Sequence, residues 1–319
     1  MSVTRPTLSI CIPTRNRAEE LVYLLDNICR RKNIEICISD NASVDETEIV
    51  IKELQKHYAN LYYNRNSNDL GYYENVKKTL QMSRGRYIWL LGDDDVPIKN
   101  AIAEILNNLL GNDFLIINSE GWNRDMSKHN GNNTLKILED RLYKIGDHQK
   151  VLEDVGSYSL YMGSMVIRRD LIMKQLVLNK YYFRTDAGKN YPHTLLFYNG
   201  IVGHAGKLIA KPLLRIRGEN GSWNSRIMDL IYIQPYQVFS MLKGYSKIPK
   251  LPIVDYIRAI RVSKKAKRHH FNYYIRYINQ LKESNIKKLI IIFAVLLPIS
   301  VLDMITFAYK KIMVIRWSL

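Results

Sequence analysis

The 319-residue sequence predicts an α/β fold with a mostly parallel central sheet and helices on both faces. Two observations carry this prediction. Short apolar runs alternate with segments of helical periodicity through the first 120 residues. Polar and acidic clusters follow the apolar runs directly, as is typical of the edge at which open α/β sheets bind ligands.

The expected elements follow one another in a regular order. Each strand is an apolar run, and each helix repeats its apolar residues every three to four positions. The expected strands are Leu8–Ile12, Ile34–Ser39, Leu61–Tyr63, Tyr87–Gly92 and Phe114–Asn118, and the expected helices are Arg17–Arg31, Asp45–Tyr58, Tyr72–Met82 and Asn100–Leu110. The polar stretch from about Trp122 to Ser159 gives no assignment, and the chain from Ile227 onward is expected to be helical and basic.

Composition separates the C-terminal quarter from the rest of the chain. Residues 243–319 contain 16 basic and 3 acidic residues, a net charge of +13 out of +17 for the whole sequence. Cys11, Cys29 and Cys37 are too few for a disulfide framework and predict a reduced compartment. Because the N-terminus lacks the apolar stretch of a signal peptide, we expect the catalytic part in the cytoplasm.

Asp93, Asp94 and Asp95 directly follow the uncharged strand that ends at Gly92. Three adjacent carboxylates repel one another unless a cation lies among them. A hard divalent cation, Mg²⁺ or Mn²⁺, that also holds a pyrophosphate is the expected partner. The alternative is a surface turn of solvated acids.

Three further polar clusters follow strands and contain residues suited to a nucleotide and its phosphates. The candidates are Pro13, Thr14, Asn16 and Arg17 after the first strand, Asp40 and Asn41 after the second, and Asn68 and Gly71 after the third, with Asn75 one helical turn later. Asp40 is suited to accept a hydrogen bond from a base or ribose. Each cluster alone is equally compatible with ordinary turn chemistry, but we expect all four at one edge of the sheet.

These motifs resemble those of family 2 nucleotide-sugar glycosyltransferases over roughly residues 7–215. The resemblance implies the glycosyltransferase-A fold and a nucleoside diphosphate sugar donor. It assigns Asp40 to the nucleobase or ribose, and Asp93 and Asp94 to the donor diphosphate. The metal ion is expected on Asp95 and Asp93. It also implies a catalytic domain over residues 1–225, with a nucleotide-sugar half (about 1–120) and an acceptor half (about 121–225).

The segment Gly92–Asp95 together with Tyr191-Pro192-His193 is similar to the abequosyltransferase-like branch of O-antigen enzymes, which use 3,6-dideoxyhexose donors. An inverting transfer needs a base for the acceptor hydroxyl. Many relatives carry a Glu-Asp pair at this position, and the present sequence does not. His193 is the predicted base and Asp186 its competitor, while the alternative for His193 is packing at a helix start. Because the Glu-Asp pair is absent, the sequence leaves open whether the transfer inverts or retains the configuration at the anomeric carbon.

Two other features have a functional and a structural interpretation. Arg215 and Arg217 either contact the diphosphate from a closing loop or are surface charges. Trp223 either stacks on a sugar or packs.

Residues 226–319 are expected to form a basic, amphipathic or hydrophobic helical tail. Arg261–His270 is strongly basic, and Leu289–Leu302 is an apolar run. Fourteen helical residues span about 21 Å, which is short of the roughly 30 Å hydrocarbon core. Lysines on both sides, at Lys287-Lys288 and Lys310-Lys311, favour an interfacial or re-entrant helix on an anionic membrane. The alternative is a buried C-terminal helix with a solvated basic face.

The sequence therefore predicts a metal-dependent glycosyltransferase that adds a sugar to a polyprenyl-diphosphate-linked glycan in O-antigen or related surface polysaccharide synthesis. We expect a peripheral or monotopic location on the cytoplasmic face of the inner membrane. A sugar nucleotidyltransferase is one alternative, but Pro13–Arg17 lacks the glycines that its triphosphate loop usually needs. A nucleic-acid-binding protein is another. Its basic residues would spread along a folded face rather than gather in a tail, so no nucleic-acid partner is expected.

Overall fold

The computed structural model describes residues 5–31, 33–129, 135–218, 234–248, 257, 260 and 285–316, with side chains to residue 308. The chain divides into two compact units. The first comprises Met1–Glu219 with Met241–Ile248, and the second comprises Asn220–Ser240 with Pro249–Leu319. Trp223 and the basic run Arg261–His270 lie outside the described residues.

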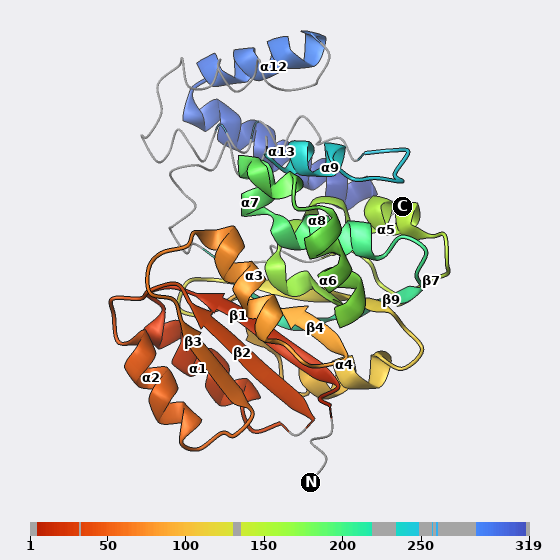
Figure 1. Ribbon diagram of the computed structural model, residues 1–319. Helices are drawn as coiled ribbons and strands as arrows, with labels where there is room; N and C mark the ends of the chain where they lie inside the picture. The colour runs from red at the N-terminus through yellow and green to blue at the C-terminus, as the bar shows by residue number, and fades with distance from the viewer. Residues whose placement is uncertain are drawn as a thin grey trace. The chain divides into compact units, whose positions relative to one another are not determined.

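The first half of the chain forms the alternating pattern expected from the sequence (Figure 1). Its elements are β1 (Leu8–Thr14), α1 (Ala18–Ile28), β2 (Ile34–Asp40), α2 (Thr47–Gln55), β3 (Leu61–Arg65), α3 (Tyr72–Met82) and β4 (Tyr87–Leu90). These four strands are parallel and lie in the order β3-β2-β1-β4. All residues of β1, β2 and β4 are buried, as continuous apolar runs predict.

The second half extends the sheet as β4-β8-β6-β9-β5 and makes it mixed. The added elements are β5 (Val96–Pro97), α4 (Ala101–Asn108), β6 (Phe114–Trp122), β7 (Arg141–Tyr143), β8 (Met165–Arg168) and β9 (Gly206–Arg217). Strand β8 is antiparallel to both β4 and β6, and β9 is antiparallel to β5 and β7. The predicted mostly parallel sheet is confirmed in part, because the sheet is mixed and β5, β7 and β8 run against the other described strands. Alternation predicts the direction of strands joined by one helix, whereas β8 lies between two strands that precede it in the chain.

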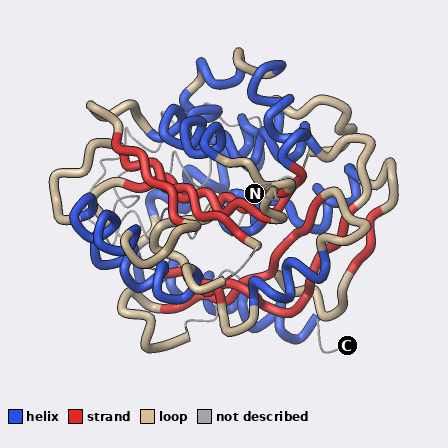
Figure 2. Tube along the Cα trace, turned by 60° about the horizontal axis from the view of Figure 1, so that its bottom comes forward, coloured by secondary structure: helices blue, strands red, loops and turns tan. Residues whose placement is uncertain are grey.

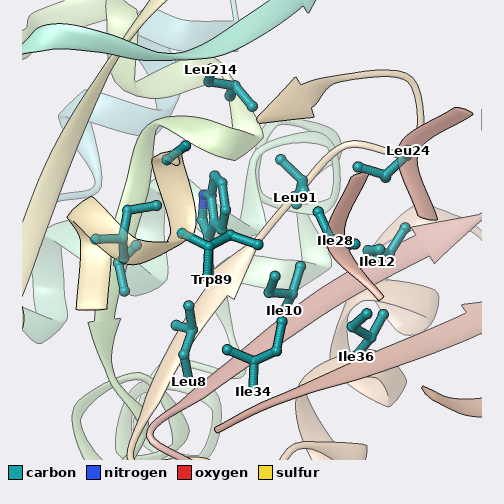
Figure 3. Close-up of a cluster of buried hydrophobic side chains, with 14 of the residues drawn as sticks. Leu8, Ile10, Ile12, Leu24, Ile28, Ile34, Ile36, Trp89, Leu91 and Leu214 are labelled. Atoms are coloured by element: carbon teal, nitrogen blue, oxygen red, sulfur yellow. The ribbon is translucent and has the colours of Figure 1, made fainter. Parts of the chain in front are cut away.

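The core lies between α1 and the sheet (Figure 3). Leu8, Ile10 and Ile12 alternate along β1 and point to the face that Leu24 and Ile28 of α1 cover, and all five are fully buried. Helix α3 contacts β1 and β2 through buried Val76 and Leu80. The strands thus have helices on both sides, as Figure 2 shows. The three cysteines are buried and unpaired.

Four further helices precede β9 in the first unit: α5 (His148–Val155), α6 (Arg169–Leu178), α7 (Asp186–Asn190) and α8 (Pro192–Gly200). The second unit contains α9 (Gln234–Ser240), α12 (Asn285–Leu296) and α13 (Ile299–Arg316). In the part of the chain that the structure describes, no helix combines the length and apolarity needed to cross a bilayer.

Candidate active site

The polar clusters predicted from the sequence lie at one edge of the sheet. The parallel register aligns Thr14 of β1 with Asp40 of β2, and Asp40 with Arg65 of β3. On the side of β1 opposite to β2, β1 pairs with β4, and Asp93 lies in the loop after β4. The loops after all four strands therefore meet, and this is the edge at which α/β sheets bind ligands.

The turn Asp93–Asp95, here called the aspartate turn, is held from two sides. Thr14 Oγ1 donates a hydrogen bond to Asp93 Oδ2 at 2.7 Å. From the end of β9, the backbone N–H of Arg217 donates to Asp95 Oδ1 at 3.2 Å. The Arg217 guanidinium also donates through Nε to the carbonyl oxygen of Asp94 at 3.1 Å. Arg217 thus bonds directly to Asp94 and Asp95 of the aspartate turn. The orientation of the turn depends on residues at the ends of both β1 and β9.

The aspartate turn concentrates negative charge at a point where Asp95 is buried and Asp93 and Asp94 are half-buried. Burial, and then repulsion by Asp94, raises the pKa of Asp93 to about 7, and the same two causes raise the pKa of Asp95 well above its usual range. A Cβ on Gly92 would come within 2.9 Å of Asp95 Oδ2 and 3.2 Å of Asp94 Oδ1. A larger residue at this position would therefore force the carboxylates to shift. Such crowding of buried and half-buried acids favours a bound cation.

The aspartate turn fits Mg²⁺ or Mn²⁺ as part of an open ligand set. Within the described ranges, no group of three or more His, Cys, Asp or Glu side chains is arranged to hold a metal ion alone. Mg²⁺ usually binds proteins through one or two carboxylates, and substrate phosphates and water complete its shell. Asp95 and Asp93 supply carboxylates of this kind beside the loops predicted to hold a diphosphate.

Asp40 lies fully buried in a hydrogen-bond network at the end of β2. Its Oδ1 accepts from the backbone N–H and Oγ of Ser43 at 2.9 and 2.5 Å, and its Oδ2 accepts from the hydroxyl of Tyr63 at 2.7 Å. Arg65 Nε lies 3.9 Å from Oδ2. A carboxylate has about four lone-pair positions, so little capacity remains for a base or ribose. The immediate role of Asp40 is to fix the Ser43 loop and Arg65.

Asp69 joins three of the loops, although the sequence did not single it out. Its Oδ1 accepts from Asn41 Nδ2 at 2.5 Å and from the backbone N–H of Gly71 at 2.9 Å. Its Oδ2 pairs with Arg15. Asp69 therefore connects the loops after β1, β2 and β3. An Asp two residues before a Gly, as in an Asx turn, is the sequence signal that identifies such a residue.

The other predicted donor-binding residues also lie in this loop cluster, and several support the backbone. Asn75 Nδ2 donates to the carbonyl oxygen of Thr14 at 3.3 Å. Asn16 adopts a left-handed conformation (φ 52°) and accepts from the N–H of Val44 at 2.8 Å. Pro13 is buried within β1, and Asn68 is exposed beside Gly71 on the third loop.

Arg17 supplies positive charge at the start of α1. Its guanidinium pairs with Glu20 at 3.1 Å. Burial lowers the pKa of Arg17, but Asp93, Asp94 and Glu20 together outweigh burial, and the pKa is raised. Among the predicted residues it is the cation best placed to face a diphosphate held at the aspartate turn.

Tyr72 and Tyr161 are further neighbours of the aspartate turn. Burial raises the pKa of Tyr72, and Asp93 and Asp94 raise it further. Its hydroxyl donates to the sulfur of Met162 at 3.3 Å. Burial and then Asp95 likewise raise the pKa of Tyr161. These aromatic residues come from α3 and from the segment before β8. A pairing between distant segments is not visible in the sequence.

The two predicted bases have different environments. His193 is buried at the start of α8, where its Nε2 lies 2.9 Å from the carbonyl oxygen of Leu160 and burial lowers its pKa to about 4. Its Nδ1 has no hydrogen-bond partner among the described residues. Asp186 is exposed in the first turn of α7. In the described structure, neither side chain forms a hydrogen bond or ion pair with the aspartate turn.

Arg215 is part of the protein surface rather than of the aspartate turn. It pairs with Glu120 at 3.3 Å and lies over the ring of Trp122, 4.3 Å from its centroid. It also lines a cavity of about 350 Å³ between α1 and residues 96–102, which none of the predicted donor-binding, metal-binding or catalytic residues line.

Comparison with known proteins identifies the family. Residues 9–174 match the model of Glycosyl transferase family 2. The chain is 30% identical over 236 residues to abequosyltransferase RfbV of Salmonella typhimurium, which covers 69% of each protein. It is 32% identical over 104 residues to the GalNAc(5)-diNAcBac-PP-undecaprenol beta-1,3-glucosyltransferase of Campylobacter jejuni, 32% of this chain and 34% of that one.

Solved glycosyltransferase structures share the fold. Residues 1–349 of S. aureus TarS align with a TM-score of 0.55 at 15% identity, covering 96% of this chain and 91% of that one. The mannosyltransferase PcManGT of Pyrobaculum calidifontis, solved with GDP-Man and Mn²⁺, aligns with a TM-score of 0.53 at 16% identity, covering 97% and 81%. The α/β fold is thus of the glycosyltransferase-A type, as the sequence motifs implied. The chain belongs to glycosyltransferase family 2 and is a glycosyltransferase.

Proposed function

We propose that this glycosyltransferase moves a sugar from a nucleoside diphosphate donor to a polyprenyl-diphosphate-linked glycan in a metal-dependent reaction. The observation that carries the proposal is the aspartate turn, with Asp95 buried and Asp93 and Asp94 half-buried, held by Thr14 and Arg217 at the ligand-binding edge of the sheet. Crowded carboxylates beside Arg17 and the three polar loops match the charges of a cation and a diphosphate.

Each part of the site has a role in this reaction. The loops that Asp69 joins hold the nucleoside, with Asp40 fixing Ser43 and Arg65 behind them. Asp95 and Asp93 would hold a divalent metal ion, which would supply Lewis-acid stabilisation of the diphosphate as a leaving group. Arg17 adds positive charge on the same side.

Of the two predicted bases, we propose Asp186 for the proton of the acceptor hydroxyl. An exposed carboxylate is accessible to an acceptor. His193 is buried, and its Nε2–H is directed at a backbone carbonyl. With a pKa near 4, its imidazole is a weak base for a hydroxyl.

The relatives support the acceptor class and the location. One is named for abequose transfer and another for a substrate on PP-undecaprenol. We propose a 3,6-dideoxyhexose donor and a lipid-linked acceptor in O-antigen or related polysaccharide synthesis, with the enzyme on the cytoplasmic face of the inner membrane. The 16 basic residues in 243–319 favour an anionic membrane surface as a partner.

Thermal stabilisation by UDP, GDP, CDP and dTDP, each with and without Mn²⁺, tests the donor site. We expect one nucleotide to raise the melting temperature and EDTA to cancel the effect. Asp95→Ala should lose the metal-dependent shift and transfer while still folding. Asp26→Ala removes an exposed carboxylate from α1 and should keep both. No shift with any nucleotide, or an unchanged shift in Asp95→Ala, would overturn the assignment.

A further inference from the structure

Helix α12 exposes a continuous apolar face. Five large apolar side chains share it: Ile286, Leu289, Ile290, Phe293 and Leu296, which are 74, 64, 45, 63 and 62% exposed. At about 100° per residue they cover an arc of about 120°. A surface helix ordinarily turns polar residues to water, as α2 does with the Glu48–Lys52 pair. Exposed apolar faces of this kind mark interaction sites.

The other side of α12 is also apolar, but it is buried. Ile291, Ala294 and Val295 are 0, 2 and 4% exposed. The helix is therefore anchored through one face and presents the other outward. In α13 of the same unit, Met304 and Phe307 are 69 and 61% exposed and lie one turn apart.

Positive charge lies on both sides of the exposed apolar arc. Lys287 and Lys288 in the first turn of α12 project about 60° and 80° beyond its two borders. The surrounding residues 243–319 carry a net charge of +13. Lysines beside an apolar arc are typical of helices that lie at the surface of an anionic membrane. The phosphate headgroups and acyl chains of an anionic bilayer match the positive charge and the apolar arc together.

We infer that α12 inserts its exposed face into the boundary between headgroups and acyl chains of an anionic bilayer. The helix has 12 residues and is about 18 Å long. A length below the roughly 30 Å hydrocarbon core suits a helix lying along the interface. The inference rests on the proposed function in one respect, because it places the enzyme on the membrane that holds the polyprenyl chain of the acceptor.

Vesicle co-sedimentation of the full chain tests the inference. Wild-type protein should bind vesicles of phosphatidylglycerol and phosphatidylcholine, and binding should fall at least about tenfold in Leu289→Glu/Phe293→Glu, since each charge must enter an apolar layer. Ile49→Glu is the matched control, because Ile49 is 69% exposed on α2 and lies outside the proposed surface. It should bind vesicles like wild type. Lys287→Gln/Lys288→Gln should weaken binding to anionic vesicles more than to pure phosphatidylcholine.

A depth measurement makes the test specific to α12. In Phe293→Trp, lipids brominated near the headgroup should quench the fluorescence of the new tryptophan more than that of the native tryptophans. Failure of wild type to bind vesicles, or equal binding by the double glutamate variant, would overturn the inference. So would a wild-type dimer that the double variant converts to a monomer, because the face would then join two copies.

The nucleotide shift separates this inference from the proposed function. The double glutamate variant should keep the nucleotide- and Mn²⁺-dependent stabilisation, since its substitutions lie outside the aspartate turn and its loops. Vesicle binding without any nucleotide shift would leave the inference standing and refute the donor site. A nucleotide shift without vesicle binding would refute the inference about α12 and leave the donor site standing.

Discussion

Protonation of His193 should destabilise the fold by a measurable amount. Burial lowers the pKa of this imidazole from 6.5 to about 4. As the pH falls below 6.5 the unfolded chain gains a proton that the folded chain does not take up until about pH 4. Stability is therefore lost on acidification, by about 1.4 kcal/mol per pH unit within this window. Between pH 7.5 and 5.0 the expected loss from His193 is about 2 kcal/mol.

Urea unfolding of wild type and His193→Gln at both pH values isolates this contribution. Glutamine retains an N–H able to reach the carbonyl oxygen of Leu160 but does not titrate. The variant should lose about 2 kcal/mol less than wild type on acidification, because every other titrating group is common to both proteins. Equal losses in the two proteins would refute the argument that His193 is held neutral by burial.

The same variant decides the catalytic role of His193. A general base contributes about 10²- to 10⁴-fold to turnover. If Asp186 is the base, His193→Gln should change kcat by less than about tenfold, while Asp186→Asn should lower kcat with little effect on nucleotide affinity. A loss of 10²-fold or more in His193→Gln at pH 7.5, where the variant remains folded, would instead make His193 the base.

Three further substitutions test how the site is held. Arg217→Ala should lower kcat/KM for the donor about 10- to 100-fold, because the aspartate turn loses its guanidinium contact. In Arg215→Ala, which removes the Glu120 pair and the contact with the Trp122 ring, steady-state kinetics should be close to wild type. Asp69→Ala should weaken nucleotide binding about tenfold by calorimetry, since three loops lose their shared acceptor; unchanged affinity would contradict that role. Gly92→Ala should abolish the Mn²⁺-dependent nucleotide shift, because its Cβ would displace the carboxylates; a retained shift would show that the turn adapts.

Local sequence patterns predicted the first half of the fold closely. The expected helix Tyr72–Met82 matches α3 at both ends, and the expected strand Ile34–Ser39 matches β2 to within one residue. Such periodicity reports how one segment buries its own face. The short strand β7, Arg141–Tyr143, gave no signal because its three residues are defined by pairing with β9, far along the chain. The reversed direction of β8 was missed for the same reason.

The candidate site was likewise predicted where local sequence decides it and missed where contacts between distant segments decide it. Residue chemistry and the ends of strands were visible in the sequence, so the structure finds the predicted residues of the first 100 positions gathered at one edge. Which oxygen bonds to which donor was not visible. Asp40 accepts three hydrogen bonds from Ser43 and Tyr63, and Asp69 joins three loops. Both facts depend on contacts between loops that follow different strands.

The aspartate turn shows why its support matters as much as its acids. Three carboxylates in sequence define the charge, but their orientation depends on Thr14 and on Arg217, which lies 122 positions after Asp95. The Thr14 hydroxyl stabilises the ionised form of Asp93 and lowers its pKa against burial. Substitution at Thr14 or Arg217 therefore changes the site without removing an acid. In a cluster whose carboxylates are buried or half-buried, the residues that donate to them determine whether the turn accepts a cation at neutral pH.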